Sequence, residues 1–296
     1  MVTETLTAPP SSPPAARREK SSDRPSPRKV SDERAQQIRE KRKKALLCVD
    51  DISVSFDGFK ALTDLTLILD KGELRCIIGP NGAGKTTLFS IISGLQRQTA
   101  GRVTLFGAPL PTGHEIVRRG MARTFQHVQL MPELSVIENV ALGAYCRTDA
   151  GFIRGLFALD EQENRQALAS ARAALERVGL GAEADLAAGS LPLGKQRIVE
   201  IARALVADPQ ILLLDEPAAG LRFSEKLTLV KILRQLQAEH VTILLVEHDM
   251  ELVMGCVERL VVLDRGRMIA EGSPKDVQAN PAVISAYLGG GRGKAA

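Results

Sequence analysis

The sequence predicts an α/β fold with a largely parallel core sheet. From Leu47 onward, short apolar runs bounded by Gly and Asp alternate with segments of helical period. The runs at 74–78, 211–215 and 242–247 are nearly continuous in apolar character, which is typical of strands that helices cover on both faces. With 44% hydrophobic residues in a chain of 296, there is enough apolar surface to bury such a sheet.

The first segment, residues 1–46, is expected to be a disordered basic tail. It carries 12 Lys or Arg and 6 Asp or Glu in a Pro- and Ser-rich sequence, with almost no large apolar side chain before its end. Such a segment cannot bury enough surface to offset its chain entropy. A basic tail could contact anionic lipid or nucleic acid, but a solvated extension is the simpler interpretation. We also expect residues 291–296 to be flexible.

The folded part, residues 47–290, begins with a pair of strands. Apolar and polar residues alternate at 48–56 and 65–70, which predicts antiparallel strands with one wet face. The core strands should follow at 74–78, 211–215, 242–247 and 260–264. The phosphate-loop segment between 79 and 95 should continue as a helix that buries Leu88, Ile91, Ile92 and Leu95.

Helical periodicity dominates residues 127–207. Within residues 160–180, apolar residues recur at helical spacing up to Val178, and Gly179 then ends the pattern. The same spacing returns from Ile198 to Leu205. This pattern predicts a helical subdomain at 127–207, inserted between the two parts of an α/β core with a β subdomain, 47–126 and 208–290.

Composition excludes several classes of protein. The longest apolar runs reach only about six residues, whereas a bilayer span needs about 20, so we expect no transmembrane helix. The start of the chain lacks the pattern of a secretory signal, which favours a cytosolic location. The four cysteines are far apart and form no metal-ligand pattern, so we expect reduced, packed thiols: Cys48, Cys76, Cys146 and Cys256.

The stretch "GPNGAGKTT" at 79–87 predicts a nucleotide phosphate site. It fits the P-loop pattern G-x-x-x-x-G-K-[ST] and follows a predicted strand. Its glycines let backbone N–H groups converge on a phosphate, its lysine adds positive charge, and a threonine hydroxyl can complete a Mg²⁺ shell. The predicted ATP-binding residues here are Gly79, Asn81, Gly82, Gly84, Lys85, Thr86 and Thr87.

Hydrolysis needs two further carboxylates, and "ILLLDEP" supplies them. Asp215 stands where an apolar run ends, suited to hold Mg²⁺ from a neighbouring strand, and Glu216 follows it directly as a general base or water-positioning group. Alone, this pattern is as typical of an ordinary strand end. About 130 residues after a P-loop it predicts an ATPase.

Five ordered motifs carry a family resemblance: "GPNGAGKTT", "RTFQ", "LPLGKQRIVEIARAL", "ILLLDEPAAGL" and "LLVEHD". Over residues 47–290 the chain resembles the ATP-binding subunit of an ABC transporter. The resemblance implies a P-loop NTPase nucleotide-binding domain with a RecA-like core, an antiparallel β subdomain and a helical subdomain. It also implies that two such subunits sandwich two ATP molecules. Each ATP is held between the phosphate loop of one subunit, residues 79–87, and the signature segment of the other subunit, residues 191–196.

The resemblance also implies site roles. Phe56 matches the aromatic residue that stacks on adenine. Gln126 matches the glutamine that meets Mg²⁺ and the attacking water, and His248 matches the switch histidine that reaches the γ-phosphate. The metal set is therefore expected to be Thr86, Gln126 and Asp215, and the catalytic set Glu216, His248 and Gln126.

The signature segment departs from the family pattern. Leu191, Gly194 and Gln196 match positions that contact the ATP of the partner subunit, but Pro192 replaces the expected serine hydroxyl. Helix-terminal N–H groups could still face the phosphate. Arg222 stands where many relatives have Asp, which leaves the contact between subunits there unassigned.

Within the family, two branches are similar to different parts of the chain. "EHDMELVMGCVERLVVLDRGRMIAEGSP" resembles importers of branched-chain or hydrophobic amino acids, while "VSFDGFKAL" resembles importers of urea and short amides. Either role implies transmembrane permease subunits, a second ABC ATPase that is identical or related, a solute-binding protein outside the membrane, and a position at the cytoplasmic face of the inner membrane.

Two readings from other classes are less well supported. A soluble ABC ATPase acting on nucleic acid or ribosomes could use the basic tail, but the chain has neither a long coiled coil nor a second cassette, and we expect no stable nucleic-acid partner. A kinase or a switch-type P-loop protein would not be expected to carry the signature segment and His248.

Overall fold

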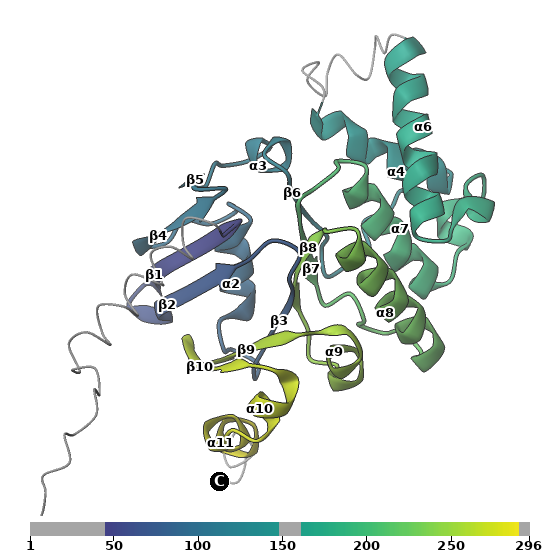
Figure 1. Cartoon of the computed structure of the whole chain (residues 1–296). Helices are drawn as coiled ribbons and strands as arrows, with labels where there is room; N and C mark the ends of the chain where they lie inside the picture. The colour runs from purple at the N-terminus through teal and green to yellow at the C-terminus, as the bar shows by residue number, and fades with distance from the viewer. Residues whose placement is uncertain (1–44, 148–160, 290–296) are drawn as a thin grey trace, which may run out of the picture. The chain divides into compact units, whose positions relative to one another are not determined.

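The computed structural model describes residues 45–147 and 161–289, all within one compact unit, Lys41–Ala296 (Figure 1). The predicted tail up to residue 44, the flexible end at 291–296 and the side chain of Cys146 lie outside the described residues. Leu46 is inside: its N–H donates to Leu69 O at 3.0 Å, and its carbonyl accepts from Phe106 N–H at 2.7 Å. The folded part therefore begins before residue 47.

The core is a six-stranded sheet with the order β10-β9-β3-β8-β7-β6. All neighbours pair in parallel except β10, which is antiparallel to β9. The strands are β3 (Leu74–Ile78), β6 (Met121–Arg123), β7 (Ile211–Asp215), β8 (Thr242–Val246), β9 (Arg259–Asp264) and β10 (Arg267–Gly272). The four predicted core strands are confirmed. However, β7 is not the immediate neighbour of β3, because β8 lies between them.

A second, antiparallel sheet has the order β2-β1-β4-β5. Its strands are β1 (Leu47–Phe56), β2 (Phe59–Leu69), β4 (Ala100–Leu105) and β5 (Ala108–Pro109). The predicted antiparallel pair is confirmed, but β2 starts earlier than expected. Register shifts in the β1–β2 pairing and a left-handed Asp64 (φ 48°) interrupt the alternation that the sequence pattern relied on.

Helices cover the core sheet. The α-helices are α2 (Lys85–Ile92), α3 (Glu115–Arg118), α4 (Val136–Ala141), α6 (Glu161–Arg177), α7 (Leu193–Leu205), α8 (Phe223–Ala238), α9 (Met250–Cys256), α10 (Pro274–Gln278) and α11 (Pro281–Gly289). Short 3₁₀ helices are η1 (Leu142–Arg147), η2 (Gly181–Glu183) and η3 (Ala188–Ser190). In the part of the chain that the structure describes, no helix is long and apolar enough to span a bilayer.

Two buried clusters sandwich the core sheet. On one face, Ile77, Leu213 and Leu244 pack with α2 and with the antiparallel sheet. On the other, alternate residues of the same strands, such as Cys76 and Leu212, pack with α7, α8 and α9. Strands β3, β7, β8 and β9 thus bury both of their faces, which explains their nearly continuous apolar sequences.

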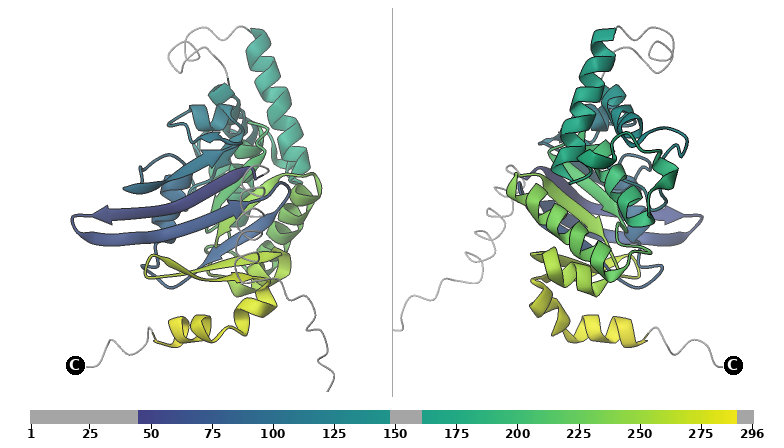
Figure 2. Two further views of the ribbon diagram at one scale, coloured as in Figure 1. Left: turned by 60° about the vertical axis from the view of Figure 1, so that its left-hand side comes forward. Right: turned by 90° about the vertical axis from the view of Figure 1, so that its right-hand side faces the viewer.

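The helices between residues 127 and 207 pack on one another. α4, α6 and α7 contact each other, and Figure 2 shows α6 projecting away from the two sheets. The apolar positions predicted for α7, from Ile198 to Leu205, are buried. These contacts fit the predicted helical subdomain, whose boundaries stay a prediction.

The helix after the phosphate loop is shorter than expected. α2 ends at Ile92, and Leu95 is 65% exposed instead of buried. Gly94 follows the helix with φ 66°, and a Cβ at this residue would lie 2.4 Å from Ile116 Cδ1. A glycine in the left-handed region ends the helix, so Leu95 leaves its apolar face.

Candidate nucleotide site

The predicted phosphate cradle is a tight loop between β3 and α2. Gly79 (φ 155°) and Gly84 (φ 100°) have positive φ, and neither has room for a side chain. A Cβ at Gly79 would lie 2.3 Å from Leu263 O, and one at Gly84 would lie 2.9 Å from Ala61 O. Backbone close to both positions therefore requires glycine.

The side chain of Lys85 folds back onto the backbone of this loop. Its Nζ donates to Gly79 O at 2.7 Å and to Pro80 O at 3.0 Å, and the side chain is buried. Burial lowers the pKa of Lys85, against the opposing effect of the Glu216 carboxylate. Asn81, Gly82 and Thr86 are exposed and Thr87 is half-buried, so the rim of the loop is open to a ligand.

Asp215 ends β7 as a buried carboxylate with a cationic partner. Its Oδ2 accepts from Arg123 Nη2 at 2.7 Å, and Arg123 also donates to Ser93 Oγ at 2.6 Å. The guanidinium lies over the rings of Phe89 and Phe125, at 5.6 and 5.5 Å from their centroids. Arg123 thus fixes Asp215 from the edge strand β6, a role that the sequence did not indicate.

Glu216 brings the three predicted catalytic residues together. Gln126 Nε2 donates to Glu216 Oε2 at 2.9 Å, and His248 Nδ1 lies 3.8 Å from Glu216 Oε1. Glu216 itself has φ 46°, and its N–H donates to Val246 O at 3.0 Å. The residues come from the segment after β6, the end of β7 and the end of β8, so the strand order of the sheet gathers them.

The residues predicted for Mg²⁺ have a suitable donor set. Asp215 offers a carboxylate held in place by Arg123, and Thr86 offers an exposed hydroxyl in the first turn of α2. Gln126 uses the N–H half of its amide on Glu216, which leaves its oxygen as the metal-binding half. Hydroxyl, carboxylate and amide oxygens are hard ligands of the kind Mg²⁺ takes alongside phosphate.

The signature segment is organised differently. Pro192 is the N-cap of α7 and gives no side-chain cap, while Gln196 Nε2 donates to Leu191 O at 2.8 Å. Gly194 is buried, and a Cβ there would lie 2.5 Å from Glu225 Oε1. Among the described residues, no hydrogen bond or ion pair joins residues 191–196 to the cradle. Phe56, predicted to stack on adenine, is 47% exposed at the end of β1, and its role stays a prediction.

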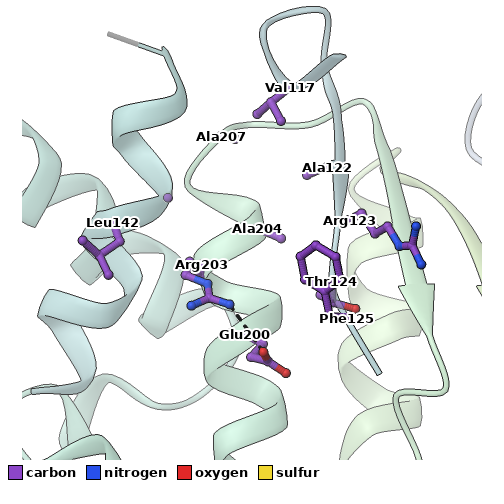
Figure 3. Close-up of a pocket in the computed structure, with 11 residues that line it drawn as sticks. Val117, Ala122, Arg123, Thr124, Phe125, Leu142, Glu200, Arg203, Ala204 and Ala207 are labelled. Carbon is purple, nitrogen blue, oxygen red and sulfur yellow. Dashed lines mark hydrogen bonds and ion pairs between the residues drawn. The ribbon is translucent and has the colours of Figure 1, made fainter. Parts of the chain in front are cut away.

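A pocket of about 250 Å³ adjoins the segment that carries Gln126 (Figure 3). It lies between the end of β6 and the helices η1 and α7, and its lining includes Phe125, Leu142, Glu200 and Arg203. Glu200 is buried, which raises its pKa, and it accepts from Gln129 N–H at 2.8 Å. Arg203 Nη1 donates to Gln129 O at 2.6 Å. The chain just after Gln126 is therefore attached to α7.

With this geometry in view, comparison with known proteins identifies the family. The family model described as "ABC transporter" matches residues 62–219, and a second model, "Branched-chain amino acid ATP-binding cassette transporter", matches residues 267–292. This chain belongs to the ABC transporter family. Its six-stranded core sheet, second antiparallel sheet and helices are the elements of an ABC ATPase cassette.

Curated relatives match the cassette over nearly their whole length. The high-affinity branched-chain amino acid transport ATP-binding protein LivG of Salmonella typhimurium is 43% identical over 249 residues, covering 82% of this chain and 98% of that protein. The corresponding protein BraF of Pseudomonas aeruginosa is 40% identical over the same share.

Solved structures give the same fold. An ATP-binding cassette of an ABC transporter in its ADP conformation superposes with a TM-score of 0.74 at 31% identity, covering 83% of this chain and 99% of that one. A nucleotide-free cassette has the same TM-score at 30% identity, covering 82% and 98%.

The sequence analysis did not single out two charged residues of the ABC cassette, the half-buried Arg123 and the buried Glu247. Arg123 stands in "RTFQ", a motif in which only Gln126 was assigned a role, and Glu247 stands directly before His248 in "LLVEHD". A charged residue at the end of an apolar strand is a weak signal, but it was visible in both motifs.

Proposed function

We propose that this chain is the ATP-hydrolysing subunit of an ABC importer for branched-chain or other hydrophobic amino acids. The observation that carries the ATPase role is the convergence of Gln126 and His248 on Glu216, at the end of the strand that also carries Asp215. The match of residues 267–292 to the branched-chain family model, together with the relatives named above, favours amino acids over urea and short amides.

The residues divide the chemistry between binding and cleavage. N–H groups of the cradle and Lys85 would hold the phosphates of ATP, with the adenine on Phe56. Thr86, Gln126 and Asp215 would hold Mg²⁺, which neutralises phosphate charge when bound. Glu216 would take up the proton of the attacking water, with Gln126 contacting that water and His248 reaching the γ-phosphate.

The proposal includes partners. Leu191, Gly194 and Gln196 at the start of α7 would face the ATP of a second ABC ATPase, so that two complete sites exist only in a dimer. Permease subunits would receive the motion at the cytoplasmic face of the inner membrane, and a solute-binding protein would deliver the amino acid. A soluble ATPase acting on ribosomes or nucleic acid remains the alternative from another class.

One experiment tests this assignment. Membranes from cells expressing the tagged chain are solubilised gently, co-purifying proteins are identified, and ATP turnover is measured with leucine or urea plus the matching binding protein. We expect two membrane subunits and leucine-stimulated turnover. If urea with its binding protein stimulates turnover and leucine does not, the chain belongs to a urea importer. Recovery of ribosomes without membrane proteins would overturn the importer assignment.

A further inference from the structure

Glu247, at the end of β8, is a carboxylate with no solvent exposure. Both of its oxygens are occupied by backbone N–H groups: Oε1 accepts from Ala218 at 2.7 Å, and Oε2 accepts from His248 at 3.1 Å and Asp249 at 3.3 Å. Burial raises the pKa of Glu247, against the lowering effect of these three N–H groups. Burying a carboxylate is unfavourable unless its oxygens are hydrogen-bonded, and here all three hydrogen bonds go to backbone N–H groups.

The N–H groups that Glu247 accepts belong to two different turns. Ala218 lies two residues after Glu216, in the turn that follows β7, whereas His248 and Asp249 form the turn that follows β8. The first turn is also held by the bond from Glu216 N–H to Val246 O at 3.0 Å. The side chain of Glu247 is thus a bridge between the turn of the carboxylate proposed as the base and the turn of the histidine next to it.

The backbone of Glu247 also contacts β3, the strand that leads into the phosphate loop. The backbone N–H of Glu247 donates to Ile77 O at 3.3 Å, one residue before the last residue of β3 and two before Gly79. The second turn is fixed further by Asp249, which caps α9 through Leu252 N–H at 3.0 Å and pairs with Lys226 of α8. One residue therefore connects the ends of β3, β7 and β8.

We propose that Glu247 is a positioning residue for ATP hydrolysis, which holds Glu216 and His248 at a fixed spacing by binding the backbone of both turns. The inference rests on the proposed ATPase function. Glu247 touches neither nucleotide nor water in this role. It acts on the rate through the placement of the two side chains, because a misplacement of about 1 Å can cost up to about 10²-fold in rate.

The test compares Glu247→Gln with Glu73→Gln in the full-length chain, purified together with its partner subunits. In Glu247→Gln the amide NH₂ cannot accept, so one of the two turns is released whichever way the amide lies. Glu73 is also a buried carboxylate, paired with Arg75 at 2.7 Å, but it stands before β3, at the end of the strand opposite the cradle. Its substitution reports the loss of a buried acid without any change at the site.

The measurements are kcat, KM for ATP, the affinity for a fluorescent ATP analogue, and the unfolding temperature. We expect Glu247→Gln to lower kcat by about 10- to 100-fold with affinity changed less than about threefold. Glu73→Gln should lower the unfolding temperature at least as much and keep kcat within about twofold of wild type.

A second variant guards against misfolding. Glu247→Asp keeps the charge, but its carboxylate is one methylene short of spanning both turns, so it should show the same selective loss of kcat. Wild-type kcat in either folded variant, or equal losses of kcat and affinity, would overturn the proposal. An absence of ATP turnover in the wild-type chain purified with its partner subunits would instead overturn the proposed function, so the two failures are distinguishable.

Discussion

The cradle and the signature segment both present backbone N–H groups near a helix N-terminus, but they differ in their contacts with the rest of the chain. The cradle follows β3, an inner strand of the core sheet, and Lys85 already occupies its interior by donating to Gly79 O at 2.7 Å. The signature segment begins α7 with Pro192 and Leu193 exposed, and its internal bond, from Gln196 to Leu191 O, does not involve the cradle.

This difference separates two kinds of site within one chain. The cradle, Asp215 and Glu216 are positioned by contacts made within the chain, so a single subunit should bind nucleotide. Among the described residues, the signature segment makes no hydrogen bond or ion pair with the cradle, so we expect it to affect turnover only when a second subunit supplies ATP. Variants of the two regions should therefore separate binding from turnover.

The largest effect is expected from Glu216→Gln. The amide cannot take up a proton from water, while Asp215 and the cradle are unchanged, so turnover should fall by about 10²- to 10⁴-fold with nucleotide affinity preserved. Phosphate release and binding of a fluorescent ATP analogue measure the two quantities. Retention of most of the turnover would assign the base to another residue.

A smaller effect, on binding itself, is expected from Lys85→Ala. Loss of one charge-assisted contact to phosphate is worth about 1.5–3 kcal/mol, so affinity for ATP should weaken by about 10- to 100-fold. Titration of the isolated chain measures this, with Lys195→Ala as the control, because Lys195 is a signature-segment lysine that pairs with Glu183. Unchanged affinity in Lys85→Ala would contradict the cradle assignment.

In the signature segment, Leu193→Asp should lower turnover by about tenfold, because Leu193 is the exposed first residue of α7. A carboxylate at the start of α7 repels the phosphates of the partner's ATP and opposes the helix dipole's attraction for anions. Leu193→Asn has nearly the same shape as Leu193→Asp without the charge, and comparing the two at equal protein concentration isolates the electrostatic part. Both variants should bind nucleotide as the wild type does. A loss of affinity in the isolated chain would erase the distinction between the two regions.

The smallest effect is expected from Pro192→Ser. Serine supplies the missing hydroxyl and is a preferred N-cap, whereas proline gives α7 no side-chain cap. We expect turnover to rise by about twofold over both wild type and Pro192→Ala. If serine and alanine behave alike, the hydroxyl has no part in contacting the partner's ATP in this chain.

The sequence by itself determined the chemistry and most of the framework. The P-loop pattern, Asp215 and Glu216, and the four core strands could be predicted because each depends on local spacing or on a continuous apolar run. The end of α2 was wrong by one turn, since Gly94 ends the helix where it meets Ile116, and apolar periodicity does not register that contact.

Tertiary structure decided which side chains meet. β8 lies between β3 and β7, so Glu247 can bind the turns after β7 and β8 and reach β3 through its backbone, and edge strand β6 delivers Arg123 to Asp215 across 92 residues of chain. Strand order and the burial of a charge depend on packing between segments distant in sequence. A single sequence carries only a weak local signal for the burial of a charge and none for strand order, so the contacts of Arg123 and Glu247 became apparent only in the folded chain.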